Sequence, residues 1–110
     1  MMIKDILSKI SHVNINEKRT ISEEYSELVF LNKDIEELYK VFADIFGQPL
    51  KKQGAKPSKD ILRLTKEYGG VWENQTLFKK DNEQNTIIAM FWPWQDNMHT
   101  TLKMAAIKNI

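Results

Sequence analysis

The sequence predicts an α+β protein: an antiparallel β-meander with two helices packed on one face of the sheet, plus a short N-terminal helix. Three observations lead to this prediction. A dense apolar run is typical of a buried strand, one segment has the period of an amphipathic helix, and short polar turns separate the last three apolar segments. After the N-terminal helix, the expected β-α-α-β-β-β order is one strand, two helices and three strands.

The densest apolar run in the chain extends from Thr86 to Trp94. Within it, Ile87 to Trp92 are six consecutive apolar residues rich in β-branched and aromatic types. The run is too short to span a membrane and has the length of a strand covered on both faces. We expect it to be the central strand of the sheet. Pro93 has no N–H to donate, so regular pairing should end or bulge there.

Two helices are expected after the first strand. Apolar residues between positions 34 and 46 recur at the helical period and fill one stripe, with charged residues on the other side, and Gly47 supplies a stop. The second helix should extend from Lys59 to Tyr68, because Ser58 is a good N-cap and Gly69-Gly70 a good C-terminal stop.

The apolar spacing of Ile3 to Ile10 predicts a helix of about two turns, which is too short to be stable unless it docks on the body or on a partner. Residues 12–24 are mostly polar and are expected to form a mobile connector. Residues 1–24 are therefore expected to be an N-terminal helix and connector, and residues 25–110 a single α+β domain. The other strands are expected at Leu28–Leu31, Val71–Phe78 and His99–Ile107.

The composition is that of a globular protein, with 42% apolar and 28% charged residues among 110. The absence of cysteine excludes disulfides, thiolate metal sites and a cysteine nucleophile. Because Met1 to Ile10 includes charged residues, it resembles neither a signal peptide nor a spanning helix, so we expect a cytoplasmic protein without membrane association. The net charge of +1 gives the whole molecule no strong attraction to nucleic acid or anionic lipid.

The sequence contains no catalytic, cofactor or metal-binding motif. Its two histidines, His12 and His99, lie far apart and form no ligand pattern, and Gly69-Gly70 follows a helix instead of preceding one as in a phosphate loop. Asp96 and His99 flank a turn beside Trp94, a spacing that can hold a carboxylate against an imidazole. We therefore expect no enzyme activity, no cofactor and no metal.

The three tryptophans lie within 23 residues, and two of them flank a proline. Packing at the core and its rim is one interpretation, because aromatic side chains bury a large area wherever they fall. The functional interpretation is a non-enzymatic protein-binding or regulatory module of the inhibitor, immunity or adaptor type, because Trp is the residue type most enriched at binding hot spots. The expected partner-binding residues are Trp72, Trp92 and Trp94. A homodimer formed through the strand at 71–78 or the N-terminal helix is a variant of the same hypothesis.

The segment from residue 51 to residue 66 has six basic residues and one acidic residue, a net charge of +5. A solvated helix face is the ordinary interpretation of such lysines. The alternative is non-specific, salt-sensitive nucleic-acid binding, since no base-reading motif accompanies the charge. The residues assigned to it are Lys51, Lys52, Lys56, Lys59, Arg63 and Lys66.

The run from Val29 to Leu50 resembles the strand, helix and Phe-Gly-x-Pro ending that open a βαβββ unit in the glyoxalase and bleomycin-resistance superfamily. The resemblance covers about a fifth of the chain. Members of that superfamily usually have two such units and place a His or Glu metal ligand on strands, whereas the first strand here has no His and only one unit fits. The resemblance implies a second alternative, small-molecule binding by a partial unit.

Overall fold

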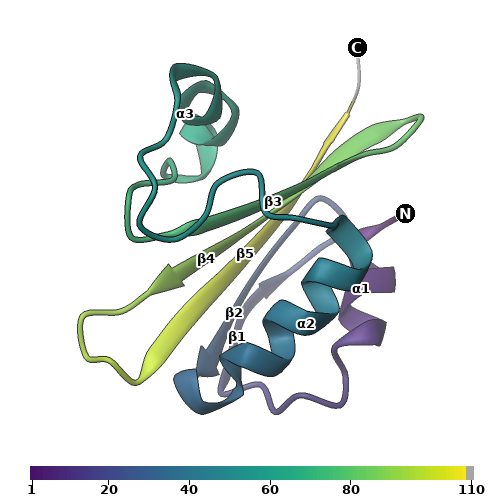
Figure 1. The fold of residues 1–110 in the computed structure, drawn as a ribbon. Helices are drawn as coiled ribbons and strands as arrows, with labels where there is room; N and C mark the ends of the chain where they lie inside the picture. Colours follow the sequence, from purple (N-terminus) through teal and green to yellow (C-terminus); the bar gives the residue numbers. More distant parts are fainter. Residues whose placement is uncertain (109–110) are drawn as a thin grey trace.

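The computed structural model describes residues 1–108, which form three α-helices, two short 3₁₀ helices and one five-stranded antiparallel sheet (Figure 1). This confirms the predicted α+β class. The α-helices are α1 (Ile3–Lys9), α2 (Ile35–Phe46) and α3 (Lys59–Thr65), and the 3₁₀ helices are Asn32–Asp34 and Lys66–Tyr68. The strands are β1 (Glu17–Ile21), β2 (Tyr25–Leu31), β3 (Thr76–Asp81), β4 (Asn85–Pro93) and β5 (His99–Lys108).

The strands lie in the order β1-β2-β5-β4-β3, and all neighbouring pairs are antiparallel. The predicted meander of the last three strands is present as β3, β4 and β5. The last strand also pairs with β2, from Tyr25 opposite Ala105 to Leu31 opposite His99. The middle strand is therefore β5. This corrects the expectation that Ile87–Trp92, which lies in β4, would be the central strand.

Helices α1 and α2 cover one face of the sheet (Figure 1). Alternate residues of β4, among them Ile87 and Phe91, point toward this face and pack with Leu38 and Phe42 of α2. Four phenylalanines meet there, and the ring centroid of Phe42 lies 5.1 Å from that of Phe91. This cluster is the main core of the protein.

Helix α3 lies on the opposite face. The other residues of β4, Ile88 and Met90, pack there with Ile61 and Leu64 of α3. This corrects the expectation that both helices would pack on one face. The physical reason is that six consecutive apolar residues in a strand present apolar side chains on both faces, and each face then needs its own cover.

The segment expected to be a connector contains strand β1. All five β1 residues are exposed, and the strand pairs with β2 through a register shift between Lys18 and Thr20. Helix α1 packs against the main core, where Ile3, Ile6 and Ile10 are at most 1% exposed.

The strand expected at Val71–Phe78 begins only at Thr76, and a loop precedes it. Lys51, in the segment after α2, is hydrogen-bonded to this loop. It is 3% exposed, and its Nζ donates hydrogen bonds to the backbone carbonyls of Lys52 and Glu73, each at 2.9 Å, and of Gln75 at 2.5 Å. Burial lowers the pKa of Lys51, and the Glu73 carboxylate acts in the opposite direction. The ammonium group thus joins the segment after α2 to the start of β3.

None of the helices within residues 1–108 has the length and apolar character needed to cross a membrane.

Candidate functional site

Trp72 has the largest exposed apolar side chain among the described residues, with 55% of its surface accessible. It lies in the loop between α3 and β3, where its backbone N–H donates to Gln75 Oε1 at 2.9 Å. The indole packs beside Gly70. A Cβ atom added to Gly70 would lie 3.6 Å from the Nε1 of Trp72. A groove of about 450 Å³ opens next to it. The groove is lined by Leu62, Arg63, Lys66, Gly69, Gly70 and Trp72.

Two exposed basic side chains flank this groove, Arg63 of α3 and Lys66 of the 3₁₀ helix that follows it. Arg63 has one acidic partner, Asp60, with 3.5 Å between Nη1 and Oδ1, and both side chains are largely exposed. An exposed ion pair at this distance contributes little energy, so the guanidinium is readily available to another anion. The structure therefore brings Trp72 next to Arg63 and Lys66. It separates Lys51 from this surface, because the ammonium group of Lys51 is buried.

Trp92 lies on the same face of the sheet as α3 and is partly buried. A Cβ atom on Gly69 would lie only 2.6 Å from its ring, and Gly69 has a φ of +98°, so this turn requires glycine. On the ring, the Nζ of Lys103 lies 3.5 Å from the centroid and also donates to the Tyr68 carbonyl at 3.3 Å. The Nε1 of Trp92 is buried and has no hydrogen-bond partner among residues 1–108.

Trp94 is also partly buried, and side chains of β1 and β5 hold it. Its Nε1 donates to Thr101 Oγ1 at 2.8 Å. The imidazole of His99 stacks on the indole with 4.6 Å between ring centroids, and the guanidinium of Arg19 lies 5.3 Å from the ring centre. The three predicted tryptophans therefore differ, because other side chains already contact the rings of Trp92 and Trp94.

Strands β1, β2 and β5 supply the polar side chains that connect these two indoles. Arg19 approaches Glu27 with 3.5 Å between Nη1 and Oε2, and Tyr25 Oη donates to Glu27 Oε1 at 2.8 Å. Burial raises the pKa of Tyr25, and the bond to Glu27 raises it further. Burial lowers the pKa of Lys103, whereas the negative charge of Glu27 acts to raise it. We call Arg19, Glu27, Lys103, Trp92 and Trp94 the cation–aromatic ladder.

The sequence alone does not show that Arg19, Glu27 and Lys103 are neighbours of the tryptophans. They come from three strands, and only the pairing of β2 with both β1 and β5 brings them together. A partial signal was present in the alternation of the last strand, which places Lys103 on the same face as Thr101.

The predicted pair Asp96 and His99 lies between β4 and β5, with Asp96 in the turn and His99 at the start of β5. The His99 Nδ1 lies 2.6 Å from Asp96 Oδ2, and the backbone N–H groups of Met98 and His99 donate to Asp96 Oδ1 at 2.9 and 3.1 Å. The bond from the Met98 N–H and the contact with the His99 ring lower the pKa of Asp96. Together these contacts fix the turn beside Trp94.

We expect the carboxyl group of Asp96 to titrate below the usual range of an aspartate, and replacing His99 by Gln to move its midpoint upward. A lowered pKa in the folded state means that this carboxylate stabilises the fold above the ordinary aspartate pKa. That contribution is lost as the pH falls through the lowered value. Carbon-detected NMR from about pH 2 to about pH 7 measures both midpoints. Equal midpoints in the two proteins would show that the imidazole has no influence.

Within residues 1–108, no group of three or more His, Asp or Glu side chains is placed to hold a metal ion. The order strand, helix and three strands is present as β2, α2, β3, β4 and β5, with α3 inserted before β3. No family model matches the chain, and comparisons with curated proteins and with solved structures give no significant match.

Proposed function

We propose that this protein is a non-enzymatic protein-binding module whose contact surface is the groove beside Trp72. The observation that supports the proposal is the indole of Trp72, which is 55% exposed next to an apolar groove. Tryptophan is strongly enriched among the residues that dominate binding energy, because one indole removes a large apolar area from water.

The lining of the groove defines the chemistry of the partner. Leu62 and Trp72 provide apolar surface, and Arg63 and Lys66 add positive charge at the edge. A protein segment with an apolar side chain next to a carboxylate is complementary to both features. Trp92 and Trp94 have a different role in this proposal, which is to support the sheet face next to the groove. Lys103 already lies over the ring of Trp92, and His99 stacks on the ring of Trp94.

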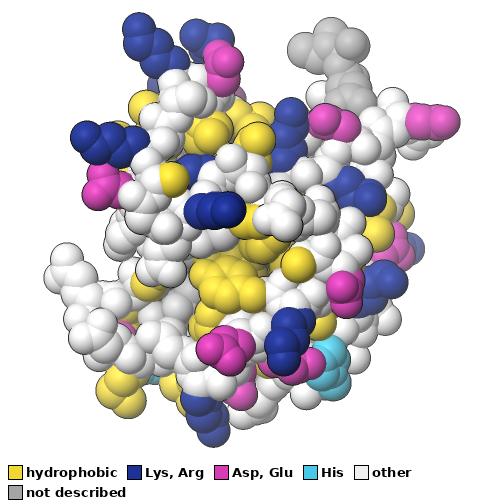
Figure 2. All heavy atoms as spheres, viewed as in Figure 1, with side chains coloured by type: hydrophobic (Ala, Val, Ile, Leu, Met, Phe, Trp, Pro, Cys, Tyr) yellow, Lys and Arg dark blue, Asp and Glu magenta, His cyan; other side chains and the backbone are white. Residues whose placement is uncertain are grey.

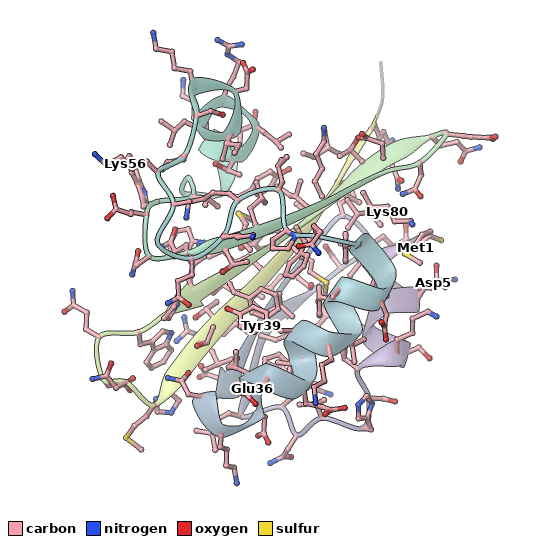
Figure 3. All side chains as sticks on the ribbon, in the orientation of Figure 1. Met1, Asp5, Glu36, Tyr39, Lys56 and Lys80 are labelled. Atoms are coloured by element: carbon pink, nitrogen blue, oxygen red, sulfur yellow. The ribbon has the colours of Figure 1, made fainter. Side chains whose placement is uncertain are left out.

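Nucleic-acid binding is the second candidate, because Lys59 and Arg63 of α3 and Lys66 of the following 3₁₀ helix are all exposed, and an indole can stack on a base. Lys52 and Lys56 are exposed in the preceding loop, and Figure 3 labels Lys56 on the α3 side of the molecule. Two observations favour a protein instead. Lys51 is buried, and the exposed carboxylates of Asp60, Glu67 and Glu73 lie in the same part of the chain.

The affinity for a captured partner is expected to fall by about 30-fold or more when Trp72 is replaced by Ala, the effect typical of a hot-spot residue. Met98→Ala is the matched control, because Met98 is 60% exposed at the turn between β4 and β5. The partner is captured from lysate with the wild-type protein and purified, and titration calorimetry with all three proteins gives the dissociation constants. Equal affinity of the wild type and Trp72→Ala would reject this groove as the contact surface.

Three further measurements separate the alternatives. Arg63→Glu is expected to weaken the binding of a carboxylate-bearing partner, because it replaces an attractive charge at the groove with a repulsive one. Fluorescence anisotropy with a single-stranded oligonucleotide at low salt tests the nucleic-acid candidate, for which log K would fall with log salt at a slope of roughly −2 if three phosphates were neutralised. Sedimentation tests a homodimer formed through β3, which is an edge strand of the sheet.

A further inference from the structure

On the α2 side of the sheet, away from the Trp72 groove, the structure contains a pocket of about 260 Å³. Its walls come from α2, from the segment that follows α2, and from β3. Figure 2 shows apolar side chains gathered in a hollow beside α2 with a basic side chain at its edge, and Figure 3 labels Tyr39, which projects from α2 at this place. The pocket is lined by Tyr39, Ala43, Pro49, Lys52, Gln53, Thr76 and Phe78.

The main core supports the floor of the pocket. Phe78 is 2% exposed, and its ring centroid lies 6.4 Å from that of Tyr39 and 5.9 Å from that of Phe42. Tyr39 in turn packs on Phe91 at 4.8 Å. Rings held on several sides change little when a ligand arrives, so this part of the pocket is preorganised.

Two hydroxyl groups lie at the pocket with an incomplete hydrogen bond. The Oη of Tyr39 and the Oγ1 of Thr76 are 3.4 Å apart. Hydroxyl–oxygen bonds are usually about 2.5 to 3.0 Å long, so this contact is weak. A ligand oxygen placed near both groups can accept a shorter bond from each of them.

The pocket also has an unbalanced charge. Lys52 is the one charged residue among those that line it, and no group within residues 1–108 makes a hydrogen bond or ion pair with its ammonium. The Lys52 carbonyl, in contrast, accepts a bond from Lys51 Nζ, which fixes the backbone at this position. An anion therefore has a cation available here and no carboxylate in the lining to repel it.

We propose that this pocket binds a small monocarboxylate, with the apolar body of the ligand on Phe78, Ala43 and Pro49 and the carboxylate at Lys52 and the two hydroxyls. The volume of about 260 Å³ is below the range of about 300 to 1,000 Å³ typical of drug-sized ligands, so the body is a single ring or a short aliphatic chain. The proposal is independent of the protein-binding function, because the two sites share no lining residue.

Benzoate and its neutral analogue benzamide test the proposal by NMR titration of the isotope-labelled wild-type protein. We expect benzoate to shift the amide signals of Ala43, Lys52, Thr76 and Phe78 with a dissociation constant of about 1 mM, reasonable for a ligand with so few atoms. Benzamide is expected to bind about fivefold or more weakly, because it lacks the charge that pairs with Lys52.

Variants locate the contacts. Lys52→Met is expected to weaken benzoate binding about fivefold and to leave benzamide binding unchanged, since it removes a largely exposed ion pair and keeps most of the side-chain stem. Lys56→Met is the matched control in the same segment and should have no effect. Thr76→Val removes one hydroxyl with little change of shape, and we expect benzoate binding about two- to fivefold weaker.

The wild-type titrations decide the matter even if a variant is unstable. Equal binding of benzoate and benzamide would overturn the assignment of a carboxylate ligand. Absent signal shifts, or shifts confined to residues around Trp72, would overturn the pocket itself. Equal effects of Lys52→Met and Lys56→Met on benzoate would show that the attraction is only the general charge of the surface.

Discussion

Replacing Phe42 by Ala is expected to lower the free energy of unfolding by about 3–5 kcal/mol, the range for aromatic truncations in well-packed cores. Phe42 is fully buried, and its ring centroid lies 5.1 Å from that of Phe91, 5.5 Å from that of Phe46 and 5.9 Å from that of Phe78. The cavity left by Ala would open between α2 and the sheet. Neighbouring rings fixed by their own contacts cannot collapse into it completely.

Urea denaturation with two probes, circular dichroism and tryptophan fluorescence, measures this change. Lys40→Ala is the control on the same helix, because Lys40 is exposed, and it should lie within about 0.5 kcal/mol of the wild type. Equal stability of the two variants would mean that the packing between α2 and the sheet is not a main source of stability.

The second large effect is expected at Lys51, where replacement by Ala should cost about 2–4 kcal/mol. Hydrogen bonds to a charged group contribute about 1.5–3 kcal/mol each, and three backbone carbonyls lose such a donor. Two effects reduce the sum: water can reach some of these carbonyls, and the desolvation cost of the ammonium disappears. The loop before β3 should loosen, since this ammonium ties Glu73 and Gln75 to the segment after α2.

Lys51→Met separates the two parts of this effect, because it keeps most of the aliphatic stem and removes only the ammonium group. We expect it to retain most of the loss measured for Lys51→Ala by thermal or urea denaturation. Lys52→Ala, at the next position and exposed, should remain within about 0.5 kcal/mol of the wild type. If Lys51→Met were as stable as the wild type, water would be satisfying the three carbonyls.

The sequence predicted the elements whose buried side has a clear period. The helical period predicts a helix at 34–46, and α2 begins at Ile35; Ser58 caps α3 by accepting a hydrogen bond from the Ile61 N–H. Strand β4 was expected from its apolar run. In each case the buried side of the element requires apolar side chains, so the spacing of apolar residues in the sequence shows which side packs against a neighbouring layer.

Other features leave no such pattern. The five residues of β1 are all exposed, so their side chains carry no record of the strand. The helical spacing of Ile61 and Leu64 indicates that α3 has a buried side, but it does not indicate which face of the sheet the helix covers. That information lay in Ile87–Trp92, because a strand that is apolar on both sides needs a layer on each.

The same distinction holds for the candidate sites. The sequence predicts Trp72 as a partner-binding residue, but its exposure and its position beside Arg63 depend on the loop that Lys51 holds. The sequence places Lys51 on a basic surface, because lysines are rarely buried, whereas the structure buries it. Neither the pocket at Tyr39 nor the cation–aromatic ladder follows from local spacing, since each combines residues from distant segments.

The position of β5 in the middle of the sheet determines when a newly made chain can fold. The ribosome synthesises β1 and β2, and later β3 and β4, but only β5 forms hydrogen bonds with both β2 and β4. Until β5 (His99–Lys108) leaves the ribosome, the two hairpins cannot join, and apolar residues such as Leu28 and Ile87 lack their neighbours on β5. Until β5 has emerged, the nascent chain exposes apolar surface of the kind that chaperones bind. Folding must then wait for contacts between residues that are far apart in the chain.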